Sequence, residues 1–356
     1  MLKRVKLDQP VHPRHSLSDK LQRLRSLHKS FGTVISSNYD VSDVCNLNCE
    51  GCLYFSGLNY TPRQSPESME AWKRFFASEA ARGVNYGYFA GAEPSLVPDV
   101  LRTAMSHIRS GVITTNGIKR ISKDIRYRIH ISLWGNESES KKTRGADNGR
   151  KALKNYRGDE RAVAVYTINR RNIGHIAAVS SLCADHGIPI TFSYFSPTDD
   201  YLARLVGMKD GKSDYFRVSS ENDNIVLGRD EYTRAHEAIA SAKDRYSDNV
   251  WYSLEYDRWV TQPAGLYQLD QDGVATDCGS RLAVHHRHFN VDMTMNSGKC
   301  CSPNIDCKSC RAYTNGYATL LSRPRQFARS DDTFEMWLDA WKLWKQIFLL
   351  EEHKLE

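Results

Sequence analysis

The sequence predicts an α/β fold: a partial (β/α)6 TIM-like barrel followed by a small Cys-rich C-terminal domain. Three observations lead to this fold class. Six strand-like runs alternate with helical patterns between residues 33 and 197, which indicates βαβ units and a parallel sheet. Short runs rich in Gly, Asn or Ser end most of these strands, at the edge where such barrels hold their active sites. Eight of the nine cysteines fall in two groups, at residues 45–52 and 278–310.

The expected strands are short runs rich in apolar and β-branched residues, and they lie at 33–40, 85–89, 111–115, 128–134, 161–168 and 188–195. The expected helices lie at 17–28, 66–82, 98–110, 118–127, 147–156 and 173–186. The second helix shows the clearest signals. Ser65 can cap it, Pro66 suits its first turn, and Met69, Trp72 and Phe76 recur at helical spacing.

Beyond residue 197 the periodicity weakens. Residues 201–212 read as a loop, 230–246 as a helix, and 289–299 as a β-hairpin. Residues 333–351 form an amphipathic helix whose stripe of Trp337, Trp344 and Phe348 is expected to pack in the core. The expected organisation is a basic N-terminal segment (1–35), the partial barrel (36–197), a linker or lid region (198–272), the Cys-rich domain (273–330) and a C-terminal helix (331–356).

Composition excludes several classes of protein. The 356 residues carry a formal charge of +7, but Lys and Arg are scattered without a long basic block, so nucleic-acid binding is not expected. No apolar stretch approaches the ~20 residues of a membrane helix, and the basic N-terminus lacks the apolar core of a signal peptide. We therefore expect a cytoplasmic protein that does not bind membranes, in which cysteines favour metal ligation over disulfides.

The first cysteine group has the spacing Cys-x3-Cys-x2-Cys, formed by Cys45, Cys49 and Cys52. Iron–sulfur clusters are normally held by four Cys thiolates. A set of three leaves one iron open to a small molecule, which is typical of a catalytic rather than a structural metal site.

This run resembles the motif of the radical S-adenosylmethionine (SAM) superfamily. The resemblance extends to Gly-Ala-Glu-Pro at 91–94, Thr-Thr-Asn-Gly at 114–117 and Ser132, and it covers about residues 36–197. It implies that Cys45, Cys49 and Cys52 hold a [4Fe–4S] cluster and that SAM chelates the open iron. Reductive cleavage of SAM then gives a 5′-deoxyadenosyl radical, which takes a hydrogen atom from the substrate.

The same resemblance implies which residues contact the cofactor. The run at 91–94 would receive the methionyl amine, with Ala92 in place of a second Gly. Ser132 would contact the ribose or carboxylate, and two residues at the end of the fifth strand would reach the ribose. The expected cofactor-binding residues are Gly91, Ala92, Glu93, Pro94, Asn116, Ser132, Tyr166 and Asn169. No catalytic side chain is identified.

One departure from the family pattern concerns the residue before the third cysteine. That residue is usually aromatic and helps to hold the adenine, but here it is Gly51. Our hypothesis is that Tyr54 or Phe55 takes over that surface.

The second cysteine group resembles the SPASM/twitch extension, which binds auxiliary [4Fe–4S] clusters. Five cysteines suffice for one cluster, as in the twitch form. Adjacent residues point in opposite directions in an extended strand, so only one of Cys300 and Cys301 should ligate. The expected metal ligands of this group are Cys278, Cys300, Cys301, Cys307 and Cys310.

Two alternatives remain open for this region. A zinc site could use the cysteines together with His285, His286 or His288. The His-His-Arg-His run itself more often forms a solvated basic loop, although at the barrel mouth it could bind a phosphate or carboxylate.

The resemblance leaves the substrate open. Residues 1–35 are too short for a leader-binding winged-helix domain, which favours a small-molecule substrate of sugar or nucleotide type in a biosynthetic pathway. An auxiliary cluster would accept an electron or anchor the substrate, and the expected electron donor is a flavodoxin or ferredoxin. The alternatives are a maturase of ribosomally made peptides (RiPPs), a sulfur-inserting enzyme and a non-catalytic iron–sulfur carrier.

Overall fold

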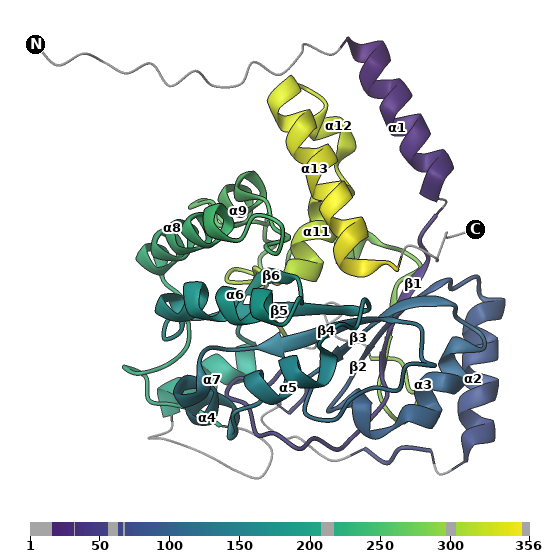
Figure 1. Ribbon diagram of the computed structural model, residues 1–356. Helices are drawn as coiled ribbons and strands as arrows, with labels where there is room; N and C mark the ends of the chain where they lie inside the picture. Colours follow the sequence, from purple (N-terminus) through teal and green to yellow (C-terminus); the bar gives the residue numbers. More distant parts are fainter. Residues whose placement is uncertain are drawn as a thin grey trace, which may run out of the picture.

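The computed structural model describes residues 16–31, 33–55, 63–66, 68–207, 217–296 and 304–350. Its centre is a seven-stranded sheet in which every paired strand is parallel, in the order β6-β5-β4-β3-β2-β1-β7 (Figure 1). The strands are β1 (Ser36–Asp40), β2 (Tyr86–Ala90), β3 (Ser110–Thr115), β4 (Arg128–Leu133), β5 (Ala162–Ile168), β6 (Ile190–Tyr194) and β7 (Arg287–Phe289). This confirms the partial barrel.

Helices follow most strands and cover one face of the sheet (Figure 1). Their bounds are α1 (Leu17–Phe31), α2 (Met69–Ala81), α3 (Pro98–Met105), α4 (Glu137–Arg144), α5 (Gly149–Tyr156), α6 (Ile176–Asp185), α7 (Asp199–Gly207), α8 (Arg229–Arg245), α9 (Leu254–Val260), α10 (Gly279–Leu282), α11 (Tyr313–Leu321), α12 (Pro324–Phe327) and α13 (Asp331–Phe348), with short 3-10 turns η1 (Pro94–Leu96) and η2 (Ile173–His175). No helix among the described residues has the length and apolar character needed to cross a membrane.

Side chains alternate between two faces of the sheet. The outer face meets the helices: Tyr39 of β1 packs on Phe75 and Phe76 of α2. The inner face is the concave side of the barrel, and it carries one polar or small residue near the carboxyl end of each of six strands. These inner residues are Asp40, Ala90, Thr114, Ser132, Thr167 and Ser193, placed by the strand register.

The end of α13 fills the amino-terminal part of the inner face. Tyr86 donates to the carbonyl of Phe348 at 2.9 Å, and His130 bonds the carbonyl of Ile347 at 2.8 Å. Phe348 also stacks on Tyr313 of α11. The expected aromatic stripe of α13 is therefore core, and the part of the barrel left for chemistry is the carboxyl-terminal part.

The N-terminal helix lies beside the C-terminal one, although they are some 300 residues apart in sequence (Figure 1). Lys20 of α1 forms an ion pair with Asp331 at 2.7 Å, and Arg23 pairs with Glu335 at 2.9 Å. These contacts attach the first described segment to α13.

Three expected elements were wrong. Residues 118–127 form turns rather than a helix, because the buried Arg161 guanidinium binds the carbonyls of Ser122 and Ile125, which a helix would use internally. Residues 201–212 were expected as a loop, but α7 runs through Asp199–Gly207. The second helix begins at Met69 with Ser68 as its cap, not at Pro66.

The Cys-rich segment also contributes to the barrel sheet. β7 pairs with β1 in parallel, with Asn38 opposite His288. Asn296 donates to the carbonyl of His288, and Phe289 bridges Met295, so the start of the expected hairpin is present. Only part of the His run is the solvated loop that was expected: His285 lies in an exposed turn and Arg287 is exposed, but His288 is buried in β7.

Candidate active site

The first cysteine group lies in the loop that follows β1, and all three thiols are partly buried. Burial raises the pKa of Cys45 to about 11. Burial, and then the neighbouring Cys49, raise the pKa of Cys52 to about 12. The effect of Cys49 on Cys52 means that the two thiols lie close together, and a cationic metal centre would reverse this penalty on the Cys52 thiolate. The loop therefore fits a metal-bound thiolate set.

Among the residues that the structure describes, no three His, Cys, Asp or Glu side chains surround a single metal ion. This result does not conflict with the fit of Cys45, Cys49 and Cys52 to a cluster, because a four-iron cluster is larger than one ion and spreads its thiolates further apart.

Hydrogen-bond donors approach the sulfurs of Cys45 and Cys49. Arg144 Nε lies 3.3 Å from the sulfur of Cys49, and the backbone N–H of Leu47 donates to Cys45 at 3.4 Å. Asn116 Nδ2 lies 3.9 Å from the same Cys45 sulfur. Such donors stabilise thiolates and tune an iron–sulfur centre. The structure thus brings the predicted residue Asn116 to the cysteine loop.

Arg144 is a site residue that the sequence did not reveal. It lies in the last turn of α4, is only 5% exposed, donates to the Ser132 carbonyl at 2.5 Å and lies over the Trp134 ring at 5.4 Å. Two signals could have found this helix. Asn136 caps its start, and Gly145 ends it in a left-handed conformation.

The turn after β2 needs glycine at its first position. Gly91 has φ +107°, and a Cβ there would lie 2.9 Å from the Ser42 carbonyl oxygen and 3.0 Å from the Val41 nitrogen. Ala92 donates its N–H to the same Ser42 carbonyl at 2.9 Å. The backbone of this turn therefore packs closely against the segment that leads into the cysteine loop. Such a close approach of backbone requires glycine.

Glu93 holds this turn to the end of β3. One carboxylate oxygen accepts from the Ser95 N–H at 3.0 Å and from the Thr115 hydroxyl at 2.5 Å. The other accepts from the Asn116 N–H at 2.9 Å. The carboxylate is buried, and Pro94 next to it begins η1. Glu93 thus acts on the site by shaping the backbone.

Ser132 lies on the inner face of β4, and its backbone carbonyl is held by hydrogen bonds from two side chains, Arg144 and Asn148. Asn148 donates to it at 3.0 Å and to the Asn116 carbonyl at 2.8 Å, which joins the ends of β3 and β4. The Ser132 side chain is partly exposed on the inner face. The structure therefore groups Ser132 with Asn116 and the cysteine loop.

The two predicted residues of β5 differ in their surroundings. Asn169 is fully buried, and its Nδ2 has no hydrogen-bond partner among the described residues. An orphaned buried donor beside the strand ends fits a ligand that supplies an acceptor. Tyr166 lies on the outer face, where its hydroxyl donates to the Asn172 carbonyl at 2.8 Å. The structure does not bring Tyr166 to the site; Thr167 has the inner position.

The space beside Gly51 is filled by an aromatic ring from another strand end. A Cβ at Gly51 would lie 2.5 Å from Cζ of Phe195, the residue after β6. Phe195 packs in turn on Trp134 and Tyr201. Phe55, one of the two residues expected to replace the missing aromatic, is buried and packs edge-on against Tyr54. Phe195 is the aromatic side chain that lies against Gly51.

The second cysteine group is buried near the end of β6. Cys278, Cys307 and Cys310 are each at most 6% exposed. Asn315 Nδ2 lies 3.5 Å from the Cys310 sulfur, and the Thr319 hydroxyl lies 3.9 Å from that of Cys278. Cys300 and Cys301 lie outside the described residues, so three of the five predicted ligands are placed.

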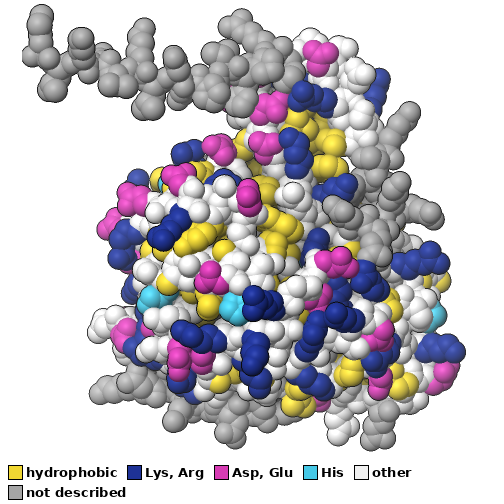
Figure 2. Space-filling view, in the orientation of Figure 1, with side chains coloured by type: hydrophobic (Ala, Val, Ile, Leu, Met, Phe, Trp, Pro, Cys, Tyr) yellow, Lys and Arg dark blue, Asp and Glu magenta, His cyan; other side chains and the backbone are white. Residues whose placement is uncertain are grey.

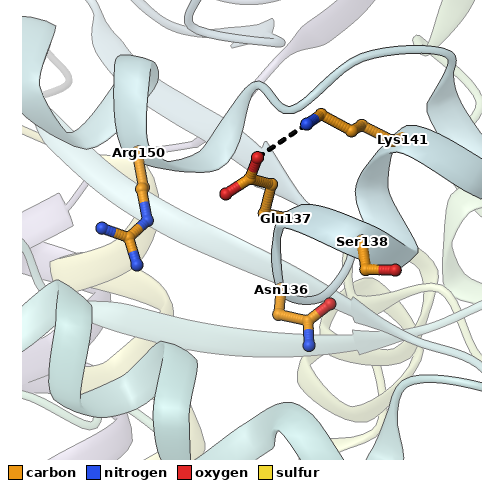
Figure 3. Close-up of a pocket in the computed structure, with 5 residues that line it drawn as sticks. All are labelled: Asn136, Glu137, Ser138, Lys141 and Arg150. Atoms are coloured by element: carbon orange, nitrogen blue, oxygen red, sulfur yellow. Dashed lines mark hydrogen bonds and ion pairs between the residues drawn. The ribbon is translucent and has the colours of Figure 1, made fainter.

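A shallow surface pocket lies elsewhere, between the starts of α4 and α5 (Figure 3). Glu137 forms an ion pair with Lys141 across it at 2.6 Å. The pocket contains none of the cysteines or inner-face residues, and its lining is Asn136, Glu137, Ser138, Lys141 and Arg150.

Similarity to known proteins agrees with this geometry, although no family model matches the sequence. A stretch of 199 residues is 25% identical to the sporulation killing factor maturation protein SkfB of Bacillus subtilis, covering 51% of this chain and 44% of SkfB. A stretch of 104 residues is 31% identical to a GTP 3′,8-cyclase of Heliobacterium modesticaldum, covering 26% of this chain and 32% of the cyclase. The chain thus matches less than half the length of either curated relative.

The fold is also that of a solved structure, histidine-tagged anSMEcpe with bound AdoMet. The two share 14% identity and a TM-score of 0.50, over 91% of this chain and 89% of that one. This likeness concerns the fold alone. Taken with the two sequence matches and the cysteine loop, it confirms the resemblance of this chain to the radical SAM superfamily.

Proposed function

We propose that this chain is a radical SAM enzyme and a peptide maturase, which modifies a peptide by abstracting a hydrogen atom from it. The observation that supports this proposal is the match to SkfB, a maturation protein, over about half of this chain. The sequence alone favoured a small polar substrate of sugar or nucleotide type. The peptide maturase was then the alternative, and the SkfB match supports it better.

A nucleotide is the second candidate substrate. It is favoured by the match to a GTP 3′,8-cyclase, which has the higher identity but covers only 26% of this chain. The longer SkfB match makes the peptide the first choice.

The residues present fit the expected cofactor, and their roles are part of the proposal. Cys45, Cys49 and Cys52 would hold the cluster. When bound, a reduced [4Fe–4S] cluster and SAM supply the 5′-deoxyadenosyl radical that takes a hydrogen atom. The backbone at 91–92 would receive the methionyl amine, because Gly91 keeps that turn free of a side chain.

The polar side chains around the loop would position the rest of SAM. Asn169 carries a buried donor without a partner among the described residues, and Ser132 has its side chain on the inner face. Arg144, between the Cys49 sulfur and the Ser132 carbonyl, would add positive charge where the SAM carboxylate is expected.

An auxiliary cluster would use Cys278, Cys307 and Cys310 together with one of Cys300 and Cys301. The first three are buried, and side-chain donors lie beside the sulfurs of Cys278 and Cys310. The segment that contains Cys307 and Cys310 is attached close to the end of β6, since the backbone N–H of Asp306 donates to the Pro197 carbonyl at 3.0 Å. Such a cluster would therefore lie at the same end of the barrel as the first.

A basic surface supports an acidic electron donor, such as a flavodoxin or ferredoxin. Lys and Arg side chains gather on the face that includes α5 (Figure 2). Asn155 of α5 donates to the Gly117 carbonyl at 3.0 Å, and Gly117 follows Asn116, which approaches Cys45. The exposed basic residues of this surface are Lys119, Arg120, Lys123, Arg150, Lys151, Lys154 and Arg157.

The test begins with protein reconstituted anaerobically with iron and sulfide. Incubation with dithionite and SAM is expected to give 5′-deoxyadenosine. Co-expression with each short open reading frame beside the gene is expected to change the mass of one encoded peptide. The matched control is the Cys45→Ala/Cys49→Ala/Cys52→Ala variant, which should leave both SAM and peptide unchanged.

Two outcomes would contradict the proposal. Turnover of GTP or another nucleotide, with every peptide unmodified, would favour the second candidate. Failure of reconstituted protein to form any 5′-deoxyadenosine would favour a non-catalytic iron–sulfur carrier.

A further inference from the structure

A histidine–aspartate pair joins the two strands at the edge of the sheet. His288 Nε2 lies 3.0 Å from Oδ2 of Asp40, the last residue of β1. His288 is 6% exposed and the Asp40 side chain is 12% exposed, so the bond is shielded from water. None of the roles assigned above uses this pair.

Both side chains lie on the inner face of the barrel. His288 is opposite Asn38 in the parallel register, and paired residues share a face. The next residues, Phe289 and Tyr39, stack on each other at 5.9 Å on the outer face, against α2. The backbone of Asp40 also lies against the turn at residues 91–94, which is proposed to receive SAM. A Cβ at Gly91 would lie 3.2 Å from the Asp40 Cα. The pair is therefore on the side of the sheet where chemistry is expected.

The hydrogen bond fixes which ring nitrogen carries the proton. A carboxylate accepts only, so Nε2 must donate to Asp40. In a neutral ring Nδ1 then carries a lone pair. Nδ1 of His288 is buried and has no hydrogen-bond partner among the described residues. A carboxylate that orients an imidazole and leaves its other nitrogen unused is the arrangement of a general base.

We propose that Nδ1 of His288 accepts a proton from an S–H, O–H or N–H group of the peptide substrate, with Asp40 as its positioning residue. The inference rests on the proposed peptide maturase. The substrate group loses H⁺ to Nδ1 and keeps the bonding electron pair. The imidazolium that forms stays beside the Asp40 carboxylate, which stabilises its charge, and it later returns the proton to solvent.

The surrounding charges suit this role. His286 lies two residues earlier and is bonded to Ser36 at 2.9 Å, and Tyr88 of β2 lies beside it. Glu79 of α2 pairs with Arg82, the residue after the helix, at 2.7 Å on the outer face. Asp40 is therefore the charged group in direct contact with His288.

The experiment compares His288→Gln and Asp40→Asn with His236→Gln. His236 is a matched control, because it pairs with Asp257 at 2.6 Å on the outer, helix-covered side, near Tyr194. With the peptide identified by co-expression, modified peptide is counted per 5′-deoxyadenosine formed. We expect His288→Gln to lower this ratio about 100-fold and Asp40→Asn at least 10-fold. His236→Gln should keep the wild-type ratio.

Further readouts separate a base from a merely structural pair. In wild-type protein the modification rate should rise with pH as a histidine loses its proton, and His288→Gln should abolish this rise. Imidazole added to His288→Ala should restore part of the rate. Histidine-labelled full-length protein, studied by ¹⁵N NMR, should show the Nε2–H form of His288 at neutral pH.

The proposal is overturned if His288→Gln behaves like His236→Gln, or if NMR finds the proton on Nδ1. If wild-type protein modifies no peptide, the proposed function fails, and NMR still decides the state of His288. If His288→Gln loses iron or unfolds, Asp40→Asn takes its place in the comparison with His236→Gln.

Discussion

Phe195 occupies the space that a side chain at Gly51 would need. The Cβ of any other residue at position 51 would meet the ring at 2.5 Å, and φ is +58°, where L-residues are strained. Gly51 directly precedes Cys52, so the cysteine loop closes against an aromatic ring from the end of β6. This contact accounts for the glycine at a position that the family usually fills with an aromatic residue.

Gly51→Ala should therefore destabilise the loop more than backbone strain alone explains. The matched control is Gly158→Ala, where φ is +68° and nothing lies within 4 Å of the added Cβ. Strain costs both variants roughly 1–2 kcal/mol. The clash with Phe195 should add roughly 1–3 kcal/mol in Gly51→Ala alone. Thermal unfolding and bound iron after reconstitution measure the difference, and equal losses in the two variants would contradict it.

Arg144→Gln should make the cluster harder to reduce. The guanidinium places positive charge 3.3 Å from the Cys49 sulfur, and positive charge favours the reduced, more negative cluster. Losing a charged hydrogen bond of about 1–2 kcal/mol lowers a one-electron potential by roughly 40–90 mV. EPR-monitored redox titration measures the shift. Arg150→Gln, an exposed change on α5, should leave the potential in place, and a shift there of the same size would refute a local effect of Arg144.

Glu93→Gln should loosen the turn at residues 91–94, which we propose receives SAM. The carboxylate accepts three hydrogen bonds, from Ser95, Thr115 and Asn116. A Gln side chain puts an NH₂ group on one of these N–H donors, which costs about 1–3 kcal/mol. We expect a lower unfolding temperature and weaker SAM binding in calorimetry. Glu137→Gln, at an exposed ion pair, should change neither. Unchanged SAM affinity in Glu93→Gln would show that the turn holds its shape without the carboxylate.

The sequence could predict those parts of the site that are formed by short contiguous motifs. The cysteine loop and the Gly91 turn are contiguous runs at strand ends, and strand rhythm placed both at one edge of the sheet. Arg144 could not be found this way. Its place in the site depends on contacts with Cys49 and Trp134, which lie far from it or outside its helix and meet it only in the folded chain.

A local pattern also does not determine which face of the sheet a side chain occupies, or which distant strand a segment pairs with. Tyr166 was expected at the cofactor, but the register turns it outward, and a shift of one residue exchanges the two faces of a strand. His288 belongs to a His-rich run that was expected to form a solvated basic loop. Its pairing with β1, about 250 residues earlier, buries it.

Replacing Cys45, Cys49 and Cys52 with Ala should leave about four irons per chain if the second cysteine group holds a cluster. Cys278, Cys307 and Cys310 are buried and more than 200 residues from the three substitutions in the sequence, so the variant keeps all of these thiols. Iron and sulfide analysis of reconstituted protein measures it. Changing Cys183 to Ala is the matched control, since that thiol is buried in α6 and belongs to neither group. Zinc in place of iron, or no metal, would contradict an auxiliary cluster.

Stability should fall as pH drops from about 6.5 towards 3, in part because His130 must become charged. Burial lowers the pKa of His130 to about 3, and its two nitrogens are held by the Ile347 carbonyl and the Tyr313 hydroxyl. Between those pH values the unfolded chain binds a proton that the folded chain refuses, so folding loses about 1.4 kcal/mol per pH unit. Burial also lowers the pKa of His286, to about 4, which acts in the same direction. Urea unfolding at several pH values should show a slope that is smaller in His130→Gln by about one proton. His186→Gln, at the partly exposed end of α6, should keep the wild-type slope, and a full slope in His130→Gln would mean that other groups account for the acid sensitivity.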